Sequence, residues 1–127
     1  MKLRIKGNSI RLRMTRSEVD ALASEGSVEE RTMFGPLDED VFSYRIEIGD
    51  GNIVAAGFSG GRMTVTVPAA IADEWAAADQ LGFSGRQMLA DGSVLDILVE
   101  KDLTCLKPRD GEDESDNFPN PDLKNSC

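Results

Sequence analysis

The feature that most constrains the fold is the recurrence of short segments in which apolar and polar residues alternate, each followed by a turn rich in glycine. At the start of the chain, Leu3 and Ile5 alternate with basic residues, and after Gly7-Asn8 the alternation resumes from Ile10 to Met14. A period of two residues places the apolar side chains on one face of a strand. The sequence therefore predicts a hairpin, or one bent strand, with its apolar face on the core and its basic face outward.

Further segments of the same kind follow along the chain. They cover residues 28–34, 42–48, 53–58 and 62–67, with turn signals at Gly49-Asp50-Gly51-Asn52 and Ser59-Gly60-Gly61. The nearly continuous apolar run Val94–Val99 favours a central strand. We expect an antiparallel meander of about five to seven strands, a pattern that allows a strongly curved or barrel-like sheet. The glycine-rich stretch Gly82–Gly85 is predicted to be a loop.

Two short helices interrupt the strands, which makes the fold class α+β. The sequence Thr15-Arg16-Ser17-Glu18 has the spacing of a capping box and predicts a helix over about residues 16–25, with Gly26 as its end. Pro68 is expected at the start of a second helix that carries Trp75 on its apolar stripe. A tryptophan in this position is typical of a core residue.

The chain divides into a body and a tail. Its 127 residues, of which 40% are hydrophobic, suit one domain, and the apolar pattern stops near Lys107. We predict a single α+β domain over residues 1–107 and an acidic, flexible tail over residues 108–127, because the tail has too few apolar side chains to offset the cost of ordering. Phe118-Pro119 is the part of the tail that is able to dock. No internal repeat is visible in the sequence.

Composition excludes several classes of protein. The formal net charge of −9 opposes general nucleic-acid binding, because like charges repel. No apolar run approaches the roughly 20 residues that a membrane-spanning helix requires, and the N-terminus does not resemble a secretory signal. The two cysteines give no disulfide framework. The sequence predicts a cytoplasmic protein that does not enter membranes.

Chemistry based on imidazole is also excluded, because the chain contains no histidine. Carboxylate, lysine, thiol and tyrosine chemistry remain, as does the absence of catalysis, which we favour. We predict no metal site and no cofactor. Cys105, between leucines, is expected to be a buried structural thiol. Asp96 within Val94–Val99 either faces outward or is a buried, paired acid with a functional role, and the sequence leaves both alternatives open.

The distribution of charge is more informative than its sum. Every charged side chain among the first sixteen residues is positive, whereas the stretch from Asp110 to Asp116 holds acids and no base. Two hypothetical sites follow. The candidate anion-binding residues are Lys2, Arg4, Lys6, Arg11, Arg13, Arg31 and Arg45, and the candidate partner-binding residues of the tail are Glu112, Asp113, Glu114, Asp116, Phe118 and Pro119. The alternative for the basic residues is a solvated face that discourages pairing between sheet edges.

Three segments together resemble a family of small bacterial proteins of unknown function. They are Met1–Arg13, Val99–Asp102 with Cys105-Leu106, and the acidic Glu112–Asp116 that precedes Phe118-Pro119-Asn120-Pro121. The resemblance covers most of the chain and implies no activity, cofactor or catalytic residue. It does imply that the acidic tail is native, which favours a role for the tail in binding.

A looser comparison is with the triphosphate-tunnel enzymes, whose strands line a tunnel with Arg, Lys and Glu. This chain has Lys-x-Arg-x-Lys at positions 2 to 6, where those enzymes have Glu-x-Glu-x-Lys. Two functions remain open. The leading one is a non-catalytic binding or adaptor module for a protein partner or a small anionic ligand, with a tail that binds a partner or masks the basic face. The alternative is a Mg²⁺-dependent phosphate-ester or nucleotide-binding enzyme in which Arg4, Arg13, Arg31 and Arg45 grip phosphate.

Overall fold

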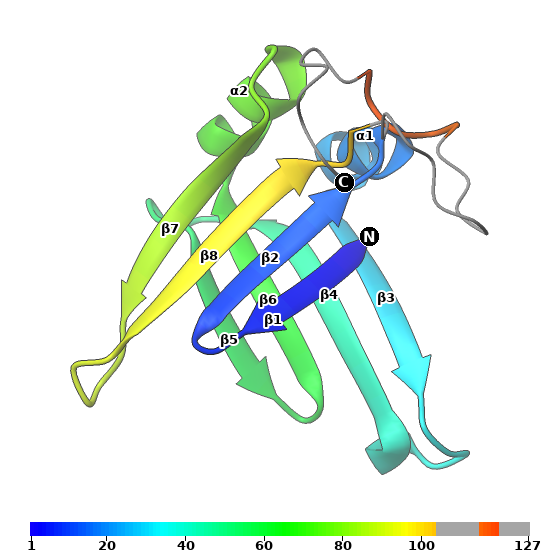
Figure 1. The fold of residues 1–127 in the computed structure, drawn as a ribbon, viewed down its shortest axis with the longest axis vertical. Coiled ribbons are helices and arrows are strands. Elements are labelled where there is room, and N and C mark those ends of the chain that lie inside the picture. The colour runs from blue at the N-terminus through cyan, green and yellow to red at the C-terminus, as the bar shows by residue number, and fades with distance from the viewer. Residues whose placement is uncertain (104–114, 120–127) are drawn as a thin grey trace.

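The computed structural model describes residues 1–103 and 115–119, which contain two α-helices and eight strands in two four-stranded sheets (Figure 1). In chain order the elements are β1 (Lys2–Lys6), β2 (Ser9–Met14), α1 (Arg16–Glu25), β3 (Ser27–Met33), the 3-10 turn η1 (Asp38–Asp40), β4 (Val41–Gly49), β5 (Ala55–Ser59), β6 (Arg62–Pro68), α2 (Ala69–Ala77), β7 (Gly82–Met88) and β8 (Val94–Lys101). The α+β class is confirmed.

The sheets are mixed, which corrects the predicted antiparallel meander. Sheet A has the strand order β1-β2-β8-β7 and sheet B the order β3-β4-β6-β5. The outer pairs of each sheet are antiparallel, but the central pairs β2–β8 and β4–β6 are parallel. The meander prediction assumed that consecutive strands pair, whereas each helix carries the chain from one sheet to the other. Neither sheet is closed or strongly curled, so the barrel-like form is also corrected.

A hairpin, a helix and a second hairpin occur twice in succession along the chain. In each sheet, the first hairpin of one half lies beside the second hairpin of the other half. Buried residues occupy equivalent positions at a constant spacing in the numbering: Leu12 and Val65 in the strands before the helices, Leu22 and Trp75 in the helices, and Ile46 and Val99 in the last strands. The topology therefore repeats where the sequence shows no repeat.

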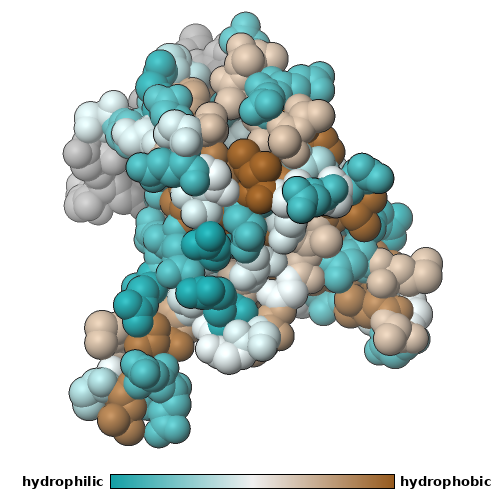
Figure 2. All heavy atoms as spheres, turned by 180° about the vertical axis from the view of Figure 1, so that it is seen from behind, coloured by the Kyte–Doolittle hydropathy of each residue, from teal (hydrophilic) through white to brown (hydrophobic). Residues whose placement is uncertain are grey.

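The core lies between the inner faces of the sheets and the two helices. Figure 1 shows sheet A crossing in front of sheet B, with both helices at one end and the hairpin turns at the other. Neither helix of the described chain has the length and apolar character needed to span a membrane. Figure 2 shows apolar surface at two projecting ends, where β3 meets η1 and where β7 turns into β8; Phe34 and Met88 are strongly exposed there.

Trp75 is a fully buried core residue, as predicted. Its ring meets Phe83 edge to face at a centroid distance of 5.1 Å, and its Nε1 donates a hydrogen bond of 3.0 Å to the carbonyl of Leu81. The loop predicted at Gly82–Gly85 was wrong, because these residues form the first part of strand β7. A Cβ on Gly85 would lie only 2.9 Å from Val54 Cβ, so the close approach of Val54 requires the glycine that weakened the strand pattern.

The start of α1 confirms the predicted capping box. Thr15 Oγ1 accepts a hydrogen bond from the Glu18 amide at 3.4 Å, and Glu18 Oε1 accepts one from the Thr15 amide at 2.9 Å. Gly26, with φ of 86°, ends the helix in the left-handed conformation. The second helix starts differently, because Pro68 is its N-cap and supplies no side-chain hydrogen bond.

Candidate functional site

Five of the seven predicted anion-binding residues share the outer face of sheet A. The register pairs Lys2 with Arg13 and Arg4 with Arg11, so these side chains lie on one face of the β1–β2 hairpin. We call this set, with Lys6, the basic face: Lys2, Arg4, Lys6, Arg11 and Arg13. Like charges directly across a strand pair repel and destabilise the sheet unless carboxylates compensate for them.

Carboxylates at the end of β8 compensate for three of the five cations. Glu100 lies beside β2 in the parallel register, and its Oε1 contacts the Nε atoms of both Arg11 and Arg13, the latter at 3.6 Å. The Glu100 side chain is only 12% exposed, which strengthens these pairs. Lys2 Nζ lies 3.0 Å from the buried Asp102 Oδ2.

Arg4 and Lys6 lack such compensation. Within the described part of the chain, neither side chain forms an ion pair or a hydrogen bond. With Ser9, Arg11 and Leu98 they line a shallow hollow of about 280 Å³. As far as the described residues go, the hollow presents two unpaired cations, one paired arginine and one hydroxyl, a set that suits the oxygens of an anion.

The other two predicted residues lie elsewhere. Arg45 and Arg31 project from the outer face of sheet B, where Arg45 Nε contacts Glu47 Oε1 at 3.3 Å. The structure thus brings together Lys2, Arg4, Lys6, Arg11 and Arg13 but not Arg31 or Arg45. Phosphate binding by Arg4, Arg13, Arg31 and Arg45 requires the strands to enclose a common space, and the open sheets place these arginines on separate outward faces.

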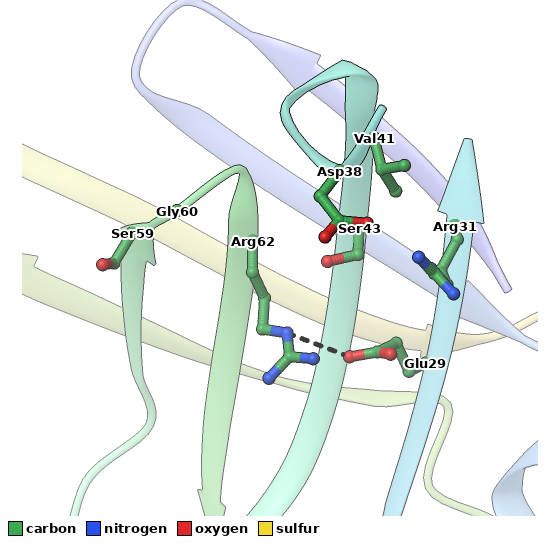
Figure 3. Close-up of a pocket in the computed structure, with 8 residues that line it drawn as sticks. All are labelled: Glu29, Arg31, Asp38, Val41, Ser43, Ser59, Gly60 and Arg62. Carbon is green, nitrogen blue, oxygen red and sulfur yellow. Dashed lines mark ion pairs between the residues drawn. The ribbon is translucent and has the colours of Figure 1, made fainter. Parts of the chain in front are cut away.

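Arg31 lines a second, polar pocket on sheet B, which sequence reasoning missed (Figure 3). The pocket has a volume of about 440 Å³ and is lined by Glu29, Arg31, Asp38, Val41, Ser43, Ser59, Gly60 and Arg62. Arg62 Nε pairs with Glu29 Oε1 at 3.1 Å, drawn as a dashed line in Figure 3. Two guanidinium groups face two carboxylates, so the lining charges cancel and the pocket has no preference for anions. Its residues come from β3, η1, β4, β5, the β5–β6 turn and β6, and no local sequence pattern links them.

The described part of the tail, residues 115–119, docks at the start of α1 rather than on the basic face. Asp116 accepts hydrogen bonds through its carbonyl from the Arg16 amide at 3.0 Å and through Oδ1 from Ser17 Oγ at 2.9 Å. Hydrogen bonds from the side chains of Thr15 and Ser17 lower the pKa of the Asp116 carboxyl. The predicted tail residues Glu112, Asp113 and Glu114 lie outside the described residues, as does the predicted boundary at 107/108.

Phe118 is the anchor of this segment. Its amide donates a 2.8 Å hydrogen bond to the carbonyl of Asp102. Its ring lies 5.1 Å from the guanidinium carbon of Arg16 and 5.3 Å from Lys101 Nζ, both within cation–π range. Burial lowers the pKa of Lys101, whose ammonium also donates to the carbonyl of Ala78 at 2.8 Å. Pro119 is exposed beside this contact.

Two glutamates and a tyrosine join the N-terminal residue Met1 to α1, β3 and β4. The α-amino group of Met1 contacts Glu18 and Glu30, and Tyr44 Oη lies 3.0 Å from the Met1 carbonyl oxygen and 3.2 Å from Glu30 Oε2. Burial opposes the charge of the amino group, but the two glutamates outweigh it and raise the pKa of that group. Burial and the charge of Glu30 raise the pKa of Tyr44.

The other residues singled out from the sequence are Asp96 and Cys105. Asp96 faces outward, with its side chain 57% exposed, and pairs with Arg86 Nε at 3.3 Å. This position settles the two alternatives in favour of an ordinary surface acid. Cys105 lies outside the described residues. Within residues 1–103 and 115–119, no three side chains of the His, Cys, Asp or Glu type are grouped as a metal site would require.

The fold and the site define an α+β protein of two mixed sheets with a basic outer face on one of them. The chain belongs to the family of unknown function DUF7009, whose model matches residues 1–122. This agrees with the resemblance noted from the sequence. Comparisons with curated proteins and with solved structures found no match.

Proposed function

We propose that the protein is a non-catalytic binding module whose basic face binds an anionic partner, either an acidic protein segment or a small anionic ligand. The observation that carries this proposal is the pair Arg4 and Lys6, which have no compensating carboxylate among the described residues although acids outnumber bases in the chain as a whole. Nearby Arg11 and Arg13 share one carboxylate, so an incoming anion meets an incompletely neutralised group of charges.

Electrostatics supports this use of the face. Arg4 lies directly across from Arg11, and the repulsion between them is relieved when an anion bridges the two strands. Hydrogen bonds between ionised groups contribute about 1.5–3 kcal/mol each when they are sheltered from water, and less in an open hollow such as this one. The expected binding is therefore weak for a monovalent anion and stronger for a ligand with several charges.

The enzymatic alternative receives less support. A Mg²⁺-dependent phosphate-ester or nucleotide-binding enzyme of the predicted kind needs arginines from both sheets around one phosphate chain, and these arginines lie on separate faces. The acidic tail keeps its proposed role in binding a partner or masking the basic face. Its docked part contacts α1 and the end of β8, so masking would fall to tail residues outside the described part.

Titration of the ¹⁵N-labelled protein with tripolyphosphate tests the proposal. We expect saturable shifts of the Arg4, Lys6 and Ser9 amides that weaken with added salt but persist at physiological ionic strength, with or without Mg²⁺. The double variant Arg4→Gln/Lys6→Gln should lose them. The matched control Arg31→Gln/Arg45→Gln removes the same charge from sheet B and should keep them. Equal loss in both variants, or shifts spread over the whole surface, would contradict a specific basic face.

A further inference from the structure

The backbone edge of β1 beside the basic face is open. Among residues 1–103 and 115–119, strand β1 pairs only with β2, so the described part of sheet A ends at β1. Met1, just before the strand, is held by Glu18, Glu30 and Tyr44, but further along Arg4, Ile5 and Lys6 are all exposed. An exposed sheet edge of this kind is a template for another strand.

We infer that β1 receives an extended acidic segment of a partner protein, which adds to sheet A as a further strand. This inference rests on the proposed function and specifies its partner.

The register shows which backbone groups are available. Lys6 and Ser9 close the two-residue turn Gly7-Asn8, and the pair beside such a turn exchanges both backbone hydrogen bonds. Pairs alternate along an antiparallel ladder, so Ile5 and Ile10 form a pair without these bonds. The N–H and C=O groups of Ile5 therefore point away from β2. Among the described residues, no backbone hydrogen bond from another element reaches Ile5.

The side chains beside this edge indicate the sequence of the guest, that is, the extended segment of the partner protein that adds to β1. Arg4 and Lys6 lie on the outer face, and Ile5, which is 58% exposed, lies on the opposite face. A strand added next to β1 places alternate side chains on these two faces. Acidic residues on the outer face would pair with Arg4 and Lys6, and apolar residues on the other face would cover Ile5. The expected guest is a strand in which acidic and apolar residues alternate.

Positive charge on β1 also selects among guests. Basic residues on an edge strand discourage pairing with neutral or basic strands, because the charges remain unpaired or repel. An acidic guest removes this penalty. The chain's own acidic stretch Asp110–Asp116 has the charge but no apolar residue to cover Ile5, which favours a segment from another protein.

The second half of the molecule supplies an internal control. Strand β5 is the edge of sheet B at the position equivalent to β1, and its residues Gly57, Phe58 and Ser59 stand where β1 has Arg4, Ile5 and Lys6. Phe58 is 70% exposed, so β5 offers an apolar edge without charge at that residue, while the Ala56 amide of the same strand donates to Gln87 Oε1 at 2.7 Å. Any strand addition driven by backbone and apolar contacts alone would occur at both edges. Addition that requires the cations would occur at β1 only.

The test uses the intact protein and synthetic peptides of about nine residues in ¹⁵N–¹H NMR titrations. A peptide that alternates Glu and Val should shift the Ile5 amide, slow its hydrogen exchange and leave Phe58 unchanged. A peptide of the same composition in shuffled order should bind at least about tenfold more weakly. Equal binding of the two peptides, or parallel shifts at Ile5 and Phe58, would overturn strand addition at β1. Stronger binding by a peptide with the sequence 110–116 would also overturn it, because the occupant would then be the chain's own tail.

Two variants separate this inference from the proposed function. Ile5→Pro removes the outward N–H while keeping Arg4 and Lys6, and proline is tolerated where an edge N–H faces solvent. It should abolish the preference for the alternating peptide and keep tripolyphosphate binding, whereas Phe58→Pro at the equivalent edge should affect neither. If tripolyphosphate binds but the alternating peptide has no advantage with the unmodified protein, only the inference fails. If neither binds, the proposed function fails as well.

Discussion

The two halves of the molecule have equivalent buried positions but carry different side chains on their outer faces. Residues 1–49 and 55–101 each form a hairpin, a helix and a second hairpin, and their buried residues occupy equivalent positions. On the outer faces, Arg11 and Arg13 of β2 correspond to Thr64 and Thr66 of β6, and Arg4 of β1 corresponds to Gly57 of β5. The first half has a basic hairpin where the second half has a nearly neutral one.

This difference shows which residues of the first hairpin are needed to form the fold and which are not. The hairpin β5–β6 forms the same structure as β1–β2 without cations, so the cations of β1–β2 are not needed to build such a hairpin. They bring cross-strand repulsion that carboxylates of β8 only partly relieve. Under the proposed function, a bound anion would relieve the repulsion that remains.

The largest effect is expected from the equivalent core positions Trp75 and Leu22. Both side chains are buried, but Trp75 also meets Phe83 edge to face and hydrogen-bonds to Leu81. We predict that Trp75→Ala lowers the free energy of unfolding by about 3–5 kcal/mol and Leu22→Ala by about 2–5 kcal/mol, with the tryptophan variant losing more. Urea denaturation followed by circular dichroism measures both. A smaller loss for Trp75→Ala would show that the second half does not depend on its larger anchor.

A smaller effect distinguishes the two helix starts. Thr15 accepts a hydrogen bond from the Glu18 amide, whereas the equivalent Pro68 accepts none through its side chain. We predict that Thr15→Ala lowers the free energy of unfolding by about 1 kcal/mol, because it leaves a first-turn N–H without its partner. The matched variant Thr15→Ser keeps the hydroxyl and should lose only a fraction of that amount. Equal losses would show that the methyl group of Thr15, rather than its oxygen, stabilises α1.

Local patterns predicted local structure well. The capping box at Thr15, the core position of Trp75 and the basic outer face of the first hairpin all followed from residues close together in the sequence. Strand β7 was missed because Gly82 and Gly85 interrupt its apolar pattern, and the reason for Gly85 is the approach of Val54, far away in the sequence. Strand pairing was mispredicted because it depends on where each helix returns the chain.

In the candidate site as well, the features that depend on residues close together in the sequence were predicted, and those that depend on residues far apart were not. Alternation was sufficient to place Lys2, Arg4 and Lys6 on one face, but their neutralisation depends on Glu100 and Asp102, which only the β2–β8 pairing brings near. Arg31 and Arg45 were grouped with them on the expectation of a strongly curved or barrel-like sheet, and the open structure places these two arginines on a separate sheet. The pocket around Arg62 and Glu29 had no sequence signal because strands β3 and β6 are not neighbours in the chain.

The smallest predicted effect concerns the docked segment 115–119, which hydrogen-bonds to α1 of the first half through Arg16 and Ser17. Hydrogen bonds lower the pKa of Asp116 in the docked state, so the ionised carboxylate favours docking. Docking should be fully present above the ordinary pKa of an aspartate and should be lost as the pH falls through the lowered pKa. The chemical shift of the Arg16 amide, which donates to Asp116, follows this change in an acid titration.

Asp116→Asn should remove the pH dependence while Phe118 remains able to contact Arg16 and Lys101, whereas Phe118→Ala should release the segment at every pH. A titration unchanged by Asp116→Asn would assign the pH dependence to another acid.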